Sequence, residues 1–579
     1  MSFLAVFNAD GAPVDGELIG AANDWTMLSP SPPIALIRRT PDSDRESKDA
    51  RDDVELDGQF HLLGRIRLDR RDELRALLGA SEADSDALLC LKAYALWGAD
   101  CVERLYGDFC FVLWDEGRRR LFCARDQLGV RPLFHARAGA TWLVGDSLDA
   151  VARQSGLSQD LDDFWIADFL TGPYCLDIDR TVYKHVKRLP PAHTLAVSRD
   201  AGVVKRYWTL DLKEPIHYRR PSQYVDHFRH VLARAIKDRL PDAGPVGVSM
   251  SGGLDSTTLA ATAVEIAGDA SRVVAFTNVF EHLLPDEEAH FSALVAKRLG
   301  IAHRIFAVDD QIEPQSSERF ASSQEPGGPP VRRSAAKLEM ARHANVWFFG
   351  EGPDNALTFE WRAHLRWLAK RRDWLRLAST IGRYVRGKEM REWLMTIDNL
   401  RLPAPPMNLL PWTRFPEWLD RGLIENLNLA ARAENGLGRP FVGDSWRPSA
   451  CASFASPIWQ AYFEHFDPVL SGSSLDARHP YADLEVLTFM LRTPPIPWGR
   501  RKRLIREAMK GVLPGDVLKR DKAPLVAGPR KGLGGGAPSS LSIDSTLRKF
   551  IDPSKLSDKT VEIGSLEKIC ALDAWLKGR

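Results

Sequence analysis

Short apolar runs separated by turn signals dominate the first 205 residues of this 579-residue chain. Dipeptides such as Asp10–Gly11 and Asp57–Gly58 are typical of turns between strands. Two stretches, Arg71–Leu78 and Asp86–Trp97, instead have apolar residues near helical spacing. Strands with a few helices between them predict a layered α+β domain over residues 1–205. The expected strands are Phe3–Phe7, Phe60–Leu63, Phe109–Trp114, Arg120–Ala124, Thr141–Val144 and Thr194–Val197.

The pattern changes after residues 206–222, a polar, proline-containing stretch typical of a linker. From residue 223 to residue 579, helical and apolar strand patterns alternate, which indicates an α/β domain with a parallel sheet. Residues 356–440 have a helical pattern, and seven of the 17 tryptophans fall between residues 347 and 418. The expected helices are Tyr224–Arg239, Thr257–Ala267 and Glu288–Leu299, and the expected strands are Val246–Met250, Val273–Phe276, His303–Ala307 and Val346–Phe349.

Composition narrows the class of protein. The chain has 78 lysines and arginines against 77 acids, so it lacks the basic excess that general nucleic-acid binding needs. Its seven cysteines form no CxxC pair, which argues against a zinc site or a disulfide framework and favours a reducing compartment. No secretory signal or membrane span is recognisable, so we expect a cytoplasmic protein.

The stretch SGGLDS at residues 251–256 lies between an expected strand and an expected helix. A glycine turn there exposes backbone N–H groups at the positive end of the helix dipole, which is an anion site. Gly252 and Gly253 allow close approach, and Ser251 and Ser256 add hydroxyl donors. Asp255 suits Mg²⁺ with bridging phosphates. The alternative is a turn with a good capping serine.

A second glycine turn, VWFFGEGPDNAL at residues 346–357, follows another expected strand. In a parallel sheet both turns lie at the carboxyl edge, where ligands bind. We therefore expect Gly350 beside the nucleotide and expect Asp354 to share Mg²⁺ with Asp255. Two strands that merely end in capped turns are the alternative.

These residues resemble the asparagine synthetase family of PP-loop ATP pyrophosphatases, whose signature S-G-G-x-D-S is matched by SGGLDS. RLDRRDELRALLG (67–79) and YGDFCFVLWDEGRRRLFCARDQLGVRPLF (106–134) resemble the family's N-terminal class II glutamine amidotransferase domain, of Ntn type. DARHPYADLEVLTFML (476–491) and RRKRLIREAM (500–509) resemble its C-terminal segment. The resemblance implies ATP and Mg²⁺, an acyl-adenylate intermediate, Lys502 as the catalytic lysine, and Glu351 as a general base or orienting group.

The chain departs from this family at its amidotransferase nucleophile. The resemblance places Ser2 where the family has a cysteine, and Leu63–Gly64 where it has an Asn-Gly pair that helps to bind glutamine. A serine hydroxyl is a much poorer nucleophile than a thiolate. We expect a degenerate amidotransferase domain, and an attacking amine that does not come from glutamine.

A subgroup, the lasso peptide cyclases, is similar at PDEE (285–288), at GEGPDNAL with Glu360–Trp361, and at SSQEPGGPP (322–330). The resemblance implies adenylation of an Asp or Glu side chain in a ribosomal precursor peptide, then isopeptide closure by its freed α-amine, with a leader peptidase as partner. The tryptophan-rich region is a candidate wall for the peptide cavity, or packing of a helical core. Two alternatives stay open: another amide-forming synthetase, either β-lactam-synthetase-like or ammonia-dependent, and a non-catalytic nucleotide-binding scaffold.

Overall fold

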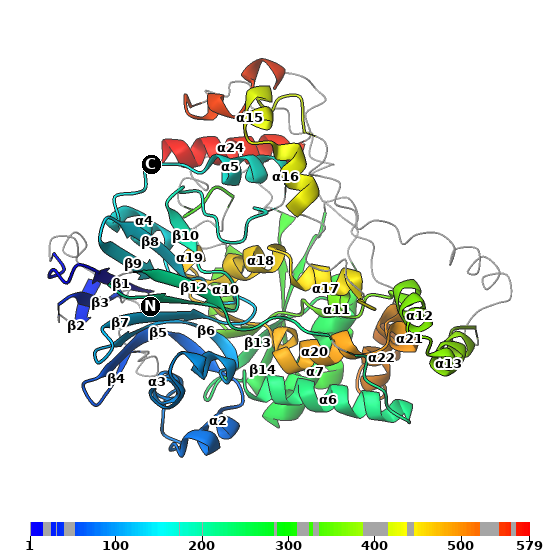
Figure 1. Ribbon diagram of the computed structural model, residues 1–579. Coiled ribbons are helices and arrows are strands. Elements are labelled where there is room, and N and C mark those ends of the chain that lie inside the picture. Colours follow the sequence, from blue (N-terminus) through cyan, green and yellow to red (C-terminus); the bar gives the residue numbers. More distant parts are fainter. Residues whose placement is uncertain are drawn as a thin grey trace.

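The computed structural model contains two six-stranded antiparallel sheets and a five-stranded parallel sheet among the residues it describes (Figure 1). Those residues are 2–15, 25–29, 32–39, 53–172, 174–199, 201–212, 214–282, 287–309, 323–327, 335–385, 415–436, 445–520, 544–556 and 563–579.

The two antiparallel sheets face each other in the first domain. One has the order β10-β8-β9-β1-β3-β2, and the other has the order β12-β11-β7-β6-β5-β4. Along β1 the side chains alternate: Phe3, Ala5 and Phe7 point between the sheets, while Leu4 and Val6 point outward. The strands are β1 (Ser2–Asn8), β2 (Trp25–Ser29), β3 (Ile34–Arg39), β4 (Asp53–Leu56), β5 (Phe60–Leu68), β6 (Gly107–Asp115), β7 (Arg120–Arg125), β8 (Phe134–Ala138), β9 (Thr141–Gly145), β10 (Val186–Arg188), β11 (His193–Val197) and β12 (Gly202–Arg206).

Helices cover both outer faces of this sandwich. Helices α2 (Arg71–Leu78) and α3 (Asp86–Trp97) share a buried cluster with β5, β6 and β7. Helices α4 (Leu148–Gln154) and α5 (Asp163–Thr171) share another with β1, β3 and β8. The layers therefore run helix, sheet, sheet, helix, and they confirm the layered α+β architecture predicted for the first domain.

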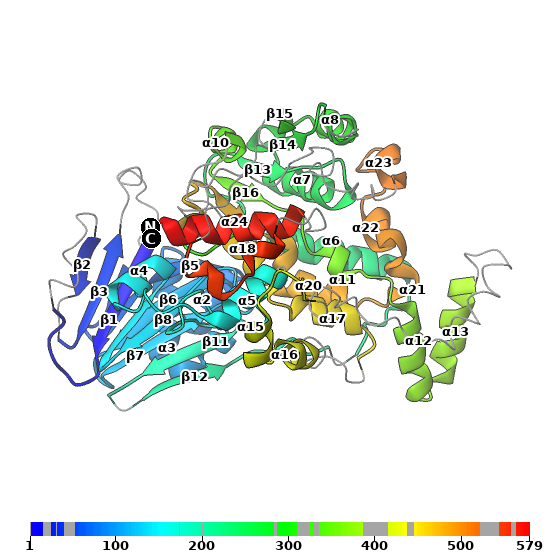
Figure 2. The same ribbon diagram turned by 90° about the horizontal axis from the view of Figure 1, so that it is seen from above.

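The end of the chain packs on this first domain. Helix α24 (Ile563–Lys577) lies beside α5 in both ribbon views (Figures 1 and 2). Its Ile569, Leu572 and Trp575 are buried in the same cluster as Leu4 and Val6 of β1. Residues 206–222 therefore separate the two domains in sequence, but the hydrophobic core of the first domain also contains side chains from the C-terminal helix. A local pattern shows that a helix has an apolar face but not which sheet that face covers.

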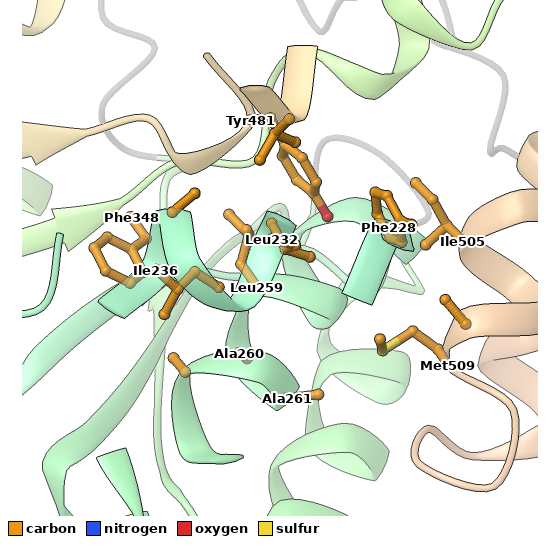
Figure 3. Close-up of a cluster of buried hydrophobic side chains, with 14 of the residues drawn as sticks. Phe228, Leu232, Ile236, Leu259, Ala260, Ala261, Phe348, Tyr481, Ile505 and Met509 are labelled. Carbon is orange, nitrogen blue, oxygen red and sulfur yellow. The ribbon is translucent and has the colours of Figure 1, made fainter. Parts of the chain in front are cut away.

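The second domain is built on a parallel sheet with the order β15-β14-β13-β16-β17. Figure 3 shows α6 packed on α7, with Leu232 and Ile236 facing Leu259 and Ala260. The strands are β13 (Val246–Ser249), β14 (Val273–Val279), β15 (Ala302–Ala307), β16 (Val346–Phe348) and β17 (Asp476–Arg478), and the helices include α6 (Pro221–Lys237), α7 (Leu254–Ala267), α8 (Glu288–Leu299), α20 (Leu484–Arg492) and α22 (Arg503–Ala508).

Most expected elements are present, but several bounds differ. Helix α7 begins at Leu254 instead of Thr257, because Gly253 is its N-cap, so Asp255 and Ser256 lie in its first turn. The segment between the two domains is shorter than the predicted linker 206–222, since β12 ends at Arg206 and α6 begins at Pro221. Strand β17 was not predicted, because three residues are too short for a recognisable alternation.

The region 356–440 is helical where it is described. It contains α12 (Trp361–Lys370), α13 (Trp374–Val385), α15 (Arg421–Asn426) and α16 (Leu429–Gly436), and residues 386–414 and 437–444 lie outside the described residues. Helices α12 and α13 lie at the opposite end of the molecule from β1–β3 in both views (Figures 1 and 2). Across the described chain, none of the helices has the length and apolar character needed to span a bilayer.

The C-terminal helix should contribute directly to the stability of the first domain. We expect Trp575→Ala to lower the free energy of unfolding by about 3 kcal/mol or more, because a nearly fully buried indole is lost from the core. Denaturant unfolding followed by circular dichroism measures this. Lys577→Ala shortens an exposed side chain whose ammonium pairs with Asp573 on the same helix, and should change stability by less than about 1 kcal/mol. Equal losses in the free energy of unfolding for the two variants would contradict the packing of Trp575 in this core.

Candidate functional site

The two glycine turns predicted from the sequence meet at the carboxyl edge of the parallel sheet. Strands β13 and β16 are hydrogen-bonded neighbours, and each runs into one of the turns. A Cβ atom on Gly350 would lie 3.1 Å from the backbone nitrogen of Ser256, so the turns are in contact. Between the strands, a Cβ on Gly247 would lie 2.3 Å from the indole of Trp347. Glycine at these positions is what allows the two turns to form one site.

Lys502 lies between the two predicted metal ligands. Its Nζ atom is 2.5 Å from Oδ2 of Asp255 and 2.5 Å from Oδ1 of Asp354. Arg501 and Lys502 both have left-handed backbone angles, with φ of 49° and 52°. Such angles are costly for non-glycine residues and are typical of functional sites. The structure thus brings together Asp255, Asp354 and Lys502, which lie far apart in the sequence.

Tyr481 holds the phosphate loop through a hydrogen bond to its backbone. This fully buried side chain follows β17, and its hydroxyl donates to the backbone oxygen of Asp255 at 3.0 Å. Figure 3 shows its ring in the same cluster as Phe228 of α6 and Ile505 of α22. Burial, with a smaller effect of Asp255, raises the pKa of Tyr481 well above its usual value, so the hydroxyl remains a donor. Tyr481 therefore ties the position of Asp255 to the core.

The N–H groups of the phosphate loop donate to side-chain oxygens. Ser251 N–H donates to Oγ of Ser256 at 3.0 Å, and Gly253 N–H donates to Oγ of Ser251 at 3.2 Å. Gly252 N–H donates to the carboxylate of Glu288, at the start of α8. The loop N–H groups are therefore bonded to protein oxygens, and at Gly252 the acceptor is an anionic carboxylate.

A cavity of about 780 Å³ opens over these residues. It is large enough for a nucleotide and part of a second substrate. Its walls include Ser251, Gly253, Asp255, Ser256, Gly350, Glu351, Asp354 and Lys502, which are predicted site residues, and also Glu288, Arg501, Arg506 and Arg520. No described tryptophan borders this cavity. Trp347 and Trp418 are instead buried in cores, as the packing alternative required.

Glu351 is paired with a tyrosine that the sequence did not indicate. The hydroxyl of Tyr462 donates to Oε2 of Glu351. Tyr462 belongs to α18 (Ile458–Phe466), where its ring contacts those of Phe466 and His479. Burial, followed by the Glu351 charge, raises the pKa of Tyr462 well above its usual value. The phenol therefore stays protonated and holds the Glu351 carboxylate at the cavity wall.

The donor set fits a magnesium ion. Two carboxylates from different turns converge on one cation, the Lys502 ammonium, and carboxylate oxygens are the ligands that Mg²⁺ prefers. Asp255 and Asp354 are the residues that would hold it. The described residues contain no group of three or more His, Cys, Asp or Glu suited to a metal. Phosphate oxygens and water would complete the coordination of an ion held by Asp255 and Asp354.

Glu360, which belongs to the motifs that resemble the lasso peptide cyclases, stabilises the start of a helix. Its carboxylate accepts from Ser449 N–H at 2.6 Å and from the buried Arg447 at 3.2 Å. It thereby caps α17 (Pro448–Phe454) outside the cavity. Within PDEE, only Glu287 and Glu288 belong to the described residues, and within SSQEPGGPP, only residues 323–327 do.

Ser2, at the position of the family's amidotransferase nucleophile, is hydrogen-bonded to a network of buried ion pairs. The Ser2 hydroxyl donates to Oδ1 of Asp146 at 2.6 Å, and Ser2 is only 8% exposed. The other oxygen of Asp146 pairs with Arg65 at 2.8 Å, and Arg65 pairs with Asp467 of the second domain at 3.0 Å. Leu63 is fully buried between the sheets. The Ser2 hydroxyl is thus hydrogen-bonded to a carboxylate that is already paired with Arg65.

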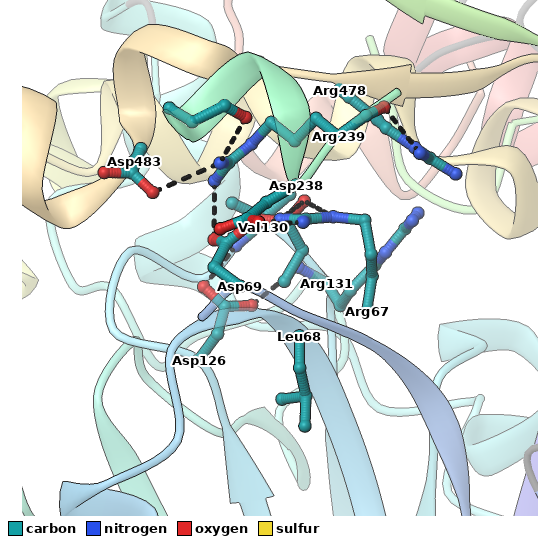
Figure 4. A network of polar contacts seen from close by, with 12 residues as sticks. Arg67, Leu68, Asp69, Asp126, Val130, Arg131, Asp238, Arg239, Arg478 and Asp483 are labelled. Atoms are coloured by element: carbon teal, nitrogen blue, oxygen red, sulfur yellow. Dashed lines mark hydrogen bonds and ion pairs between the residues drawn. The ribbon is translucent and has the colours of Figure 1, made fainter. Parts of the chain in front are cut away.

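A second part of this network joins the domains at Arg239 (Figure 4). Its guanidinium pairs with Asp69 at 2.8 Å and with Asp483 at 3.2 Å, and its backbone oxygen accepts from Arg478 of β17. Burial favours the neutral acid at Asp69, but Arg239 and Arg67 outweigh it and hold the pKa of Asp69 below its usual value. The Asp69–Arg239 ion pair and the hydrogen bond from Arg478 therefore connect the first domain to the strand that precedes Tyr481.

Four functional contacts were missed by sequence reasoning: those of Tyr462, Tyr481, Glu288 and Arg520. Tyr481 lies within DARHPYADLEVLTFML and Glu288 within PDEE, but no local sequence pattern indicates their contacts. No sequence pattern marks Tyr462 or Arg520, because tertiary packing alone brings Tyr462 to Glu351 and Arg520 to the cavity wall.

Comparisons with known proteins agree with this geometry. The family described as "Glutamine amidotransferase domain" matches residues 67–208, and the family described as "Asparagine synthase" matches residues 227–550. These matches and the observed sheets confirm the predicted fold class, an Ntn-type amidotransferase-like domain followed by an α/β synthetase domain.

Curated relatives extend over most of the chain. "Asparagine synthetase [glutamine-hydrolyzing] 3" of Bacillus subtilis (strain 168) is 26% identical over 496 residues, which are 79% of this chain and 73% of that protein. "Putative asparagine synthetase [glutamine-hydrolyzing]" of Mycobacterium bovis is 28% identical over 491 residues, with 79% and 72% covered. "Amidase chyE" of Penicillium rubens is 24% identical over 507 residues, with 78% and 74% covered.

Lys502 is the side chain whose loss should be most informative. We expect Lys502→Met to lower ATP-dependent pyrophosphate release by about a hundredfold or more, because a cation aimed at developing negative charge is lost. The same change frees Asp255 and Asp354 from the ammonium, so added Mg²⁺ should raise the thermal unfolding midpoint of the variant more than that of the wild type.

Lys510→Met, at an exposed lysine outside the cavity, serves as the control and should behave like the wild type. Pyrophosphate release by Lys502→Met at the wild-type rate would contradict a catalytic role for Lys502. An unchanged response to Mg²⁺ would contradict a metal at the two carboxylates.

Proposed function

Because the chain belongs to the asparagine synthase family, we propose that it is an ATP-dependent lasso peptide cyclase. Family membership makes it an amide-forming ligase that uses ATP. The narrower proposal is that the activated carboxylate is an Asp or Glu side chain of a ribosomal precursor peptide, freed of its leader. The attacking amine is that peptide's own N-terminus, and the product is a macrolactam ring.

One contrast between the two domains supports the proposal most. The synthetase cavity keeps Asp255, Asp354 and Lys502 in contact at the phosphate loop. At the nucleophile position of the first domain, Ser2 is instead bound to Asp146 within the ion network with Arg65. We infer from this contrast that activation chemistry is retained without release of ammonia from glutamine, so that the amine reaches the cavity by another route.

The first chemical step is activation of the carboxylate. A carboxylate oxygen attacks the α-phosphorus of ATP, the bond to the bridging oxygen breaks, and pyrophosphate leaves. The phosphate loop at residues 251–256 and the α7 dipole bind the phosphates, and Lys502 stabilises the charge that develops at the α-phosphate. Mg²⁺, when bound by Asp255 and Asp354, supplies charge neutralisation to the phosphates.

The second step forms the amide. The amine nitrogen attacks the acyl carbon, the bond to the phosphate oxygen breaks, and AMP leaves. Glu351 at the cavity wall is placed to accept the proton that the amine must lose, and the hydrogen bond from Tyr462 fixes its orientation. Over both steps the peptide loses one molecule of water.

A tethered amine suits this arrangement. When nucleophile and electrophile belong to one peptide, the enzyme has to hold a geometry instead of capturing a second molecule, and the effective concentration of the amine is high. A peptidase that exposes the α-amine is the partner that such a reaction requires. The resemblance of PDEE and GEGPDNAL to motifs of the lasso peptide cyclases favours the same choice of substrate.

Another amide-forming synthetase is the second candidate, because the curated relatives include proteins named asparagine synthetase. In that case free aspartate, or a β-amino acid that closes a β-lactam, takes the place of the peptide, and ammonia or an internal amine attacks. A non-catalytic scaffold is a third candidate, and the contacts of Lys502 with both carboxylates count against it.

Mass spectrometry of candidate core peptides distinguishes these functions. With ATP and Mg²⁺, we expect a peptide that has a free α-amine and an internal Asp or Glu to lose the mass of one water, and AMP to appear in equal amount. An acetylated peptide serves as the control and should not cyclise. Asp255→Ala should abolish pyrophosphate release with every substrate, whereas a scaffold would show no pyrophosphate release even before the change.

Pyrophosphate release with free aspartate and ammonia, and none with any peptide, would overturn the peptide proposal. It would leave the amide-forming ligase in place.

A further inference from the structure

One backbone donor of the phosphate loop already binds a carboxylate. Gly252 N–H donates to Oε2 of Glu288, the first residue of α8. Its neighbours Ser251 and Gly253 donate instead to neutral hydroxyl oxygens within the loop. Glu288 thus supplies an anionic acceptor at the place where the strand–turn–helix geometry prepares a site for a phosphate oxygen.

Arg520 lies on the same carboxylate and over the same loop. Its Nη2 atom donates to Oε1 of Glu288 at 3.1 Å, and its guanidinium lies 4.2 Å from the ring centroid of Phe291. A Cβ atom on Gly252 would lie 2.6 Å from Nη1 of Arg520. The backbone oxygen of Arg520 accepts from Arg506 at 2.8 Å, which fixes the start of this side chain.

The charges of the cavity wall are balanced before a nucleotide enters. Four cationic and four acidic side chains border it: Arg501, Lys502, Arg506, Arg520, Asp255, Glu288, Glu351 and Asp354. A triphosphate adds several negative charges. Asp255 and Asp354 have a use in holding a metal, but the Glu288 carboxylate competes for Gly252 N–H and repels the incoming phosphate.

We propose that Arg520 is a further phosphate-binding residue for ATP, and that Glu288 occupies the place of a phosphate oxygen until ATP displaces it. This inference rests on the proposed function only as far as ATP binding. When ATP binds, a phosphate oxygen takes over Gly252 N–H and the Arg520 guanidinium. The Glu288 side chain, which is already 25% exposed, turns toward water. The Phe291 ring keeps the guanidinium in place during the exchange.

Calorimetric titration with α,β-methylene ATP and Mg²⁺ tests the exchange without catalysis. We expect Glu288→Gln to bind the analogue about threefold or more tightly, because the competing charge is lost while the size is kept. Arg520→Gln should bind about tenfold more weakly, since a charged hydrogen-bond donor is lost. Arg520→Lys keeps the charge without the fork and should fall between the wild type and Arg520→Gln.

Matched controls are Glu287→Gln, beside Glu288 but exposed, and Arg503→Gln, beside the cavity segment but outside its wall. Both should bind like the wild type. Weaker binding by Glu288→Gln, or unchanged binding by Arg520→Gln, would overturn the proposal. If Arg520→Gln fails to fold, Glu288→Gln and Arg520→Lys still decide.

The outcomes also separate this inference from the proposed function. A wild-type protein that does not bind the analogue contradicts the use of ATP at this cavity. The wild type could bind the analogue and release pyrophosphate from ATP while Glu288→Gln and Arg520→Gln bind the analogue as tightly as their controls. That result would contradict only the exchange between Glu288 and the phosphate oxygen.

Discussion

Buried ion pairs between the two domains are the constraint on which the site depends. Arg65 is 9% exposed, and its partners Asp146 and Asp467 are fully buried, one in each domain. Charges removed from water are tolerated only when they are paired, so separating the domains would leave several of them without compensation. Arg239 adds a second connection through Asp69. These contacts fix the relative position of the domains, and with it strand β17.

That constraint reaches the cavity through Tyr481. The tyrosine follows β17, is buried in the core of the second domain, and donates to the backbone of Asp255. The first domain is thereby a structural support for the synthetase site. Its helical outer layer is completed by α24 from the other end of the chain, so neither domain is independent of the other.

The phosphate loop follows from simpler requirements. Gly252 and Gly350 stand where a Cβ atom would meet other side chains or backbone at 2.4 Å and 3.1 Å. Glycine there lets two strand ends and a helix N-terminus share one small volume. The left-handed backbone at Arg501 and Lys502 then directs the lysine between Asp255 and Asp354. Backbone strain at this position is consistent with a site whose geometry matters more than its stability.

The sequence predicted what depends on local chemistry. Short apolar runs bounded by turn signals located the main strands, and helical spacing located the helices. The two glycine turns located Asp255, Asp354 and Glu351. It did not predict contacts made by tertiary packing, such as the one between Tyr462 and Glu351, or the docking of α24 on the first domain. It also suggested that tryptophans border the cavity, whereas the described ones pack in cores or lie away from it, because composition alone cannot distinguish a cavity wall from a core.

The central claim is that the first domain supports the synthetase site and does not supply its amine. Release of glutamate from glutamine, measured together with ATP-dependent pyrophosphate release in the wild type and in Ser2→Ala, tests it most directly. The account predicts no glutamate above background in either protein, and pyrophosphate release that is the same with and without glutamine. Glutamate formation that accompanies pyrophosphate release and disappears in Ser2→Ala would contradict it.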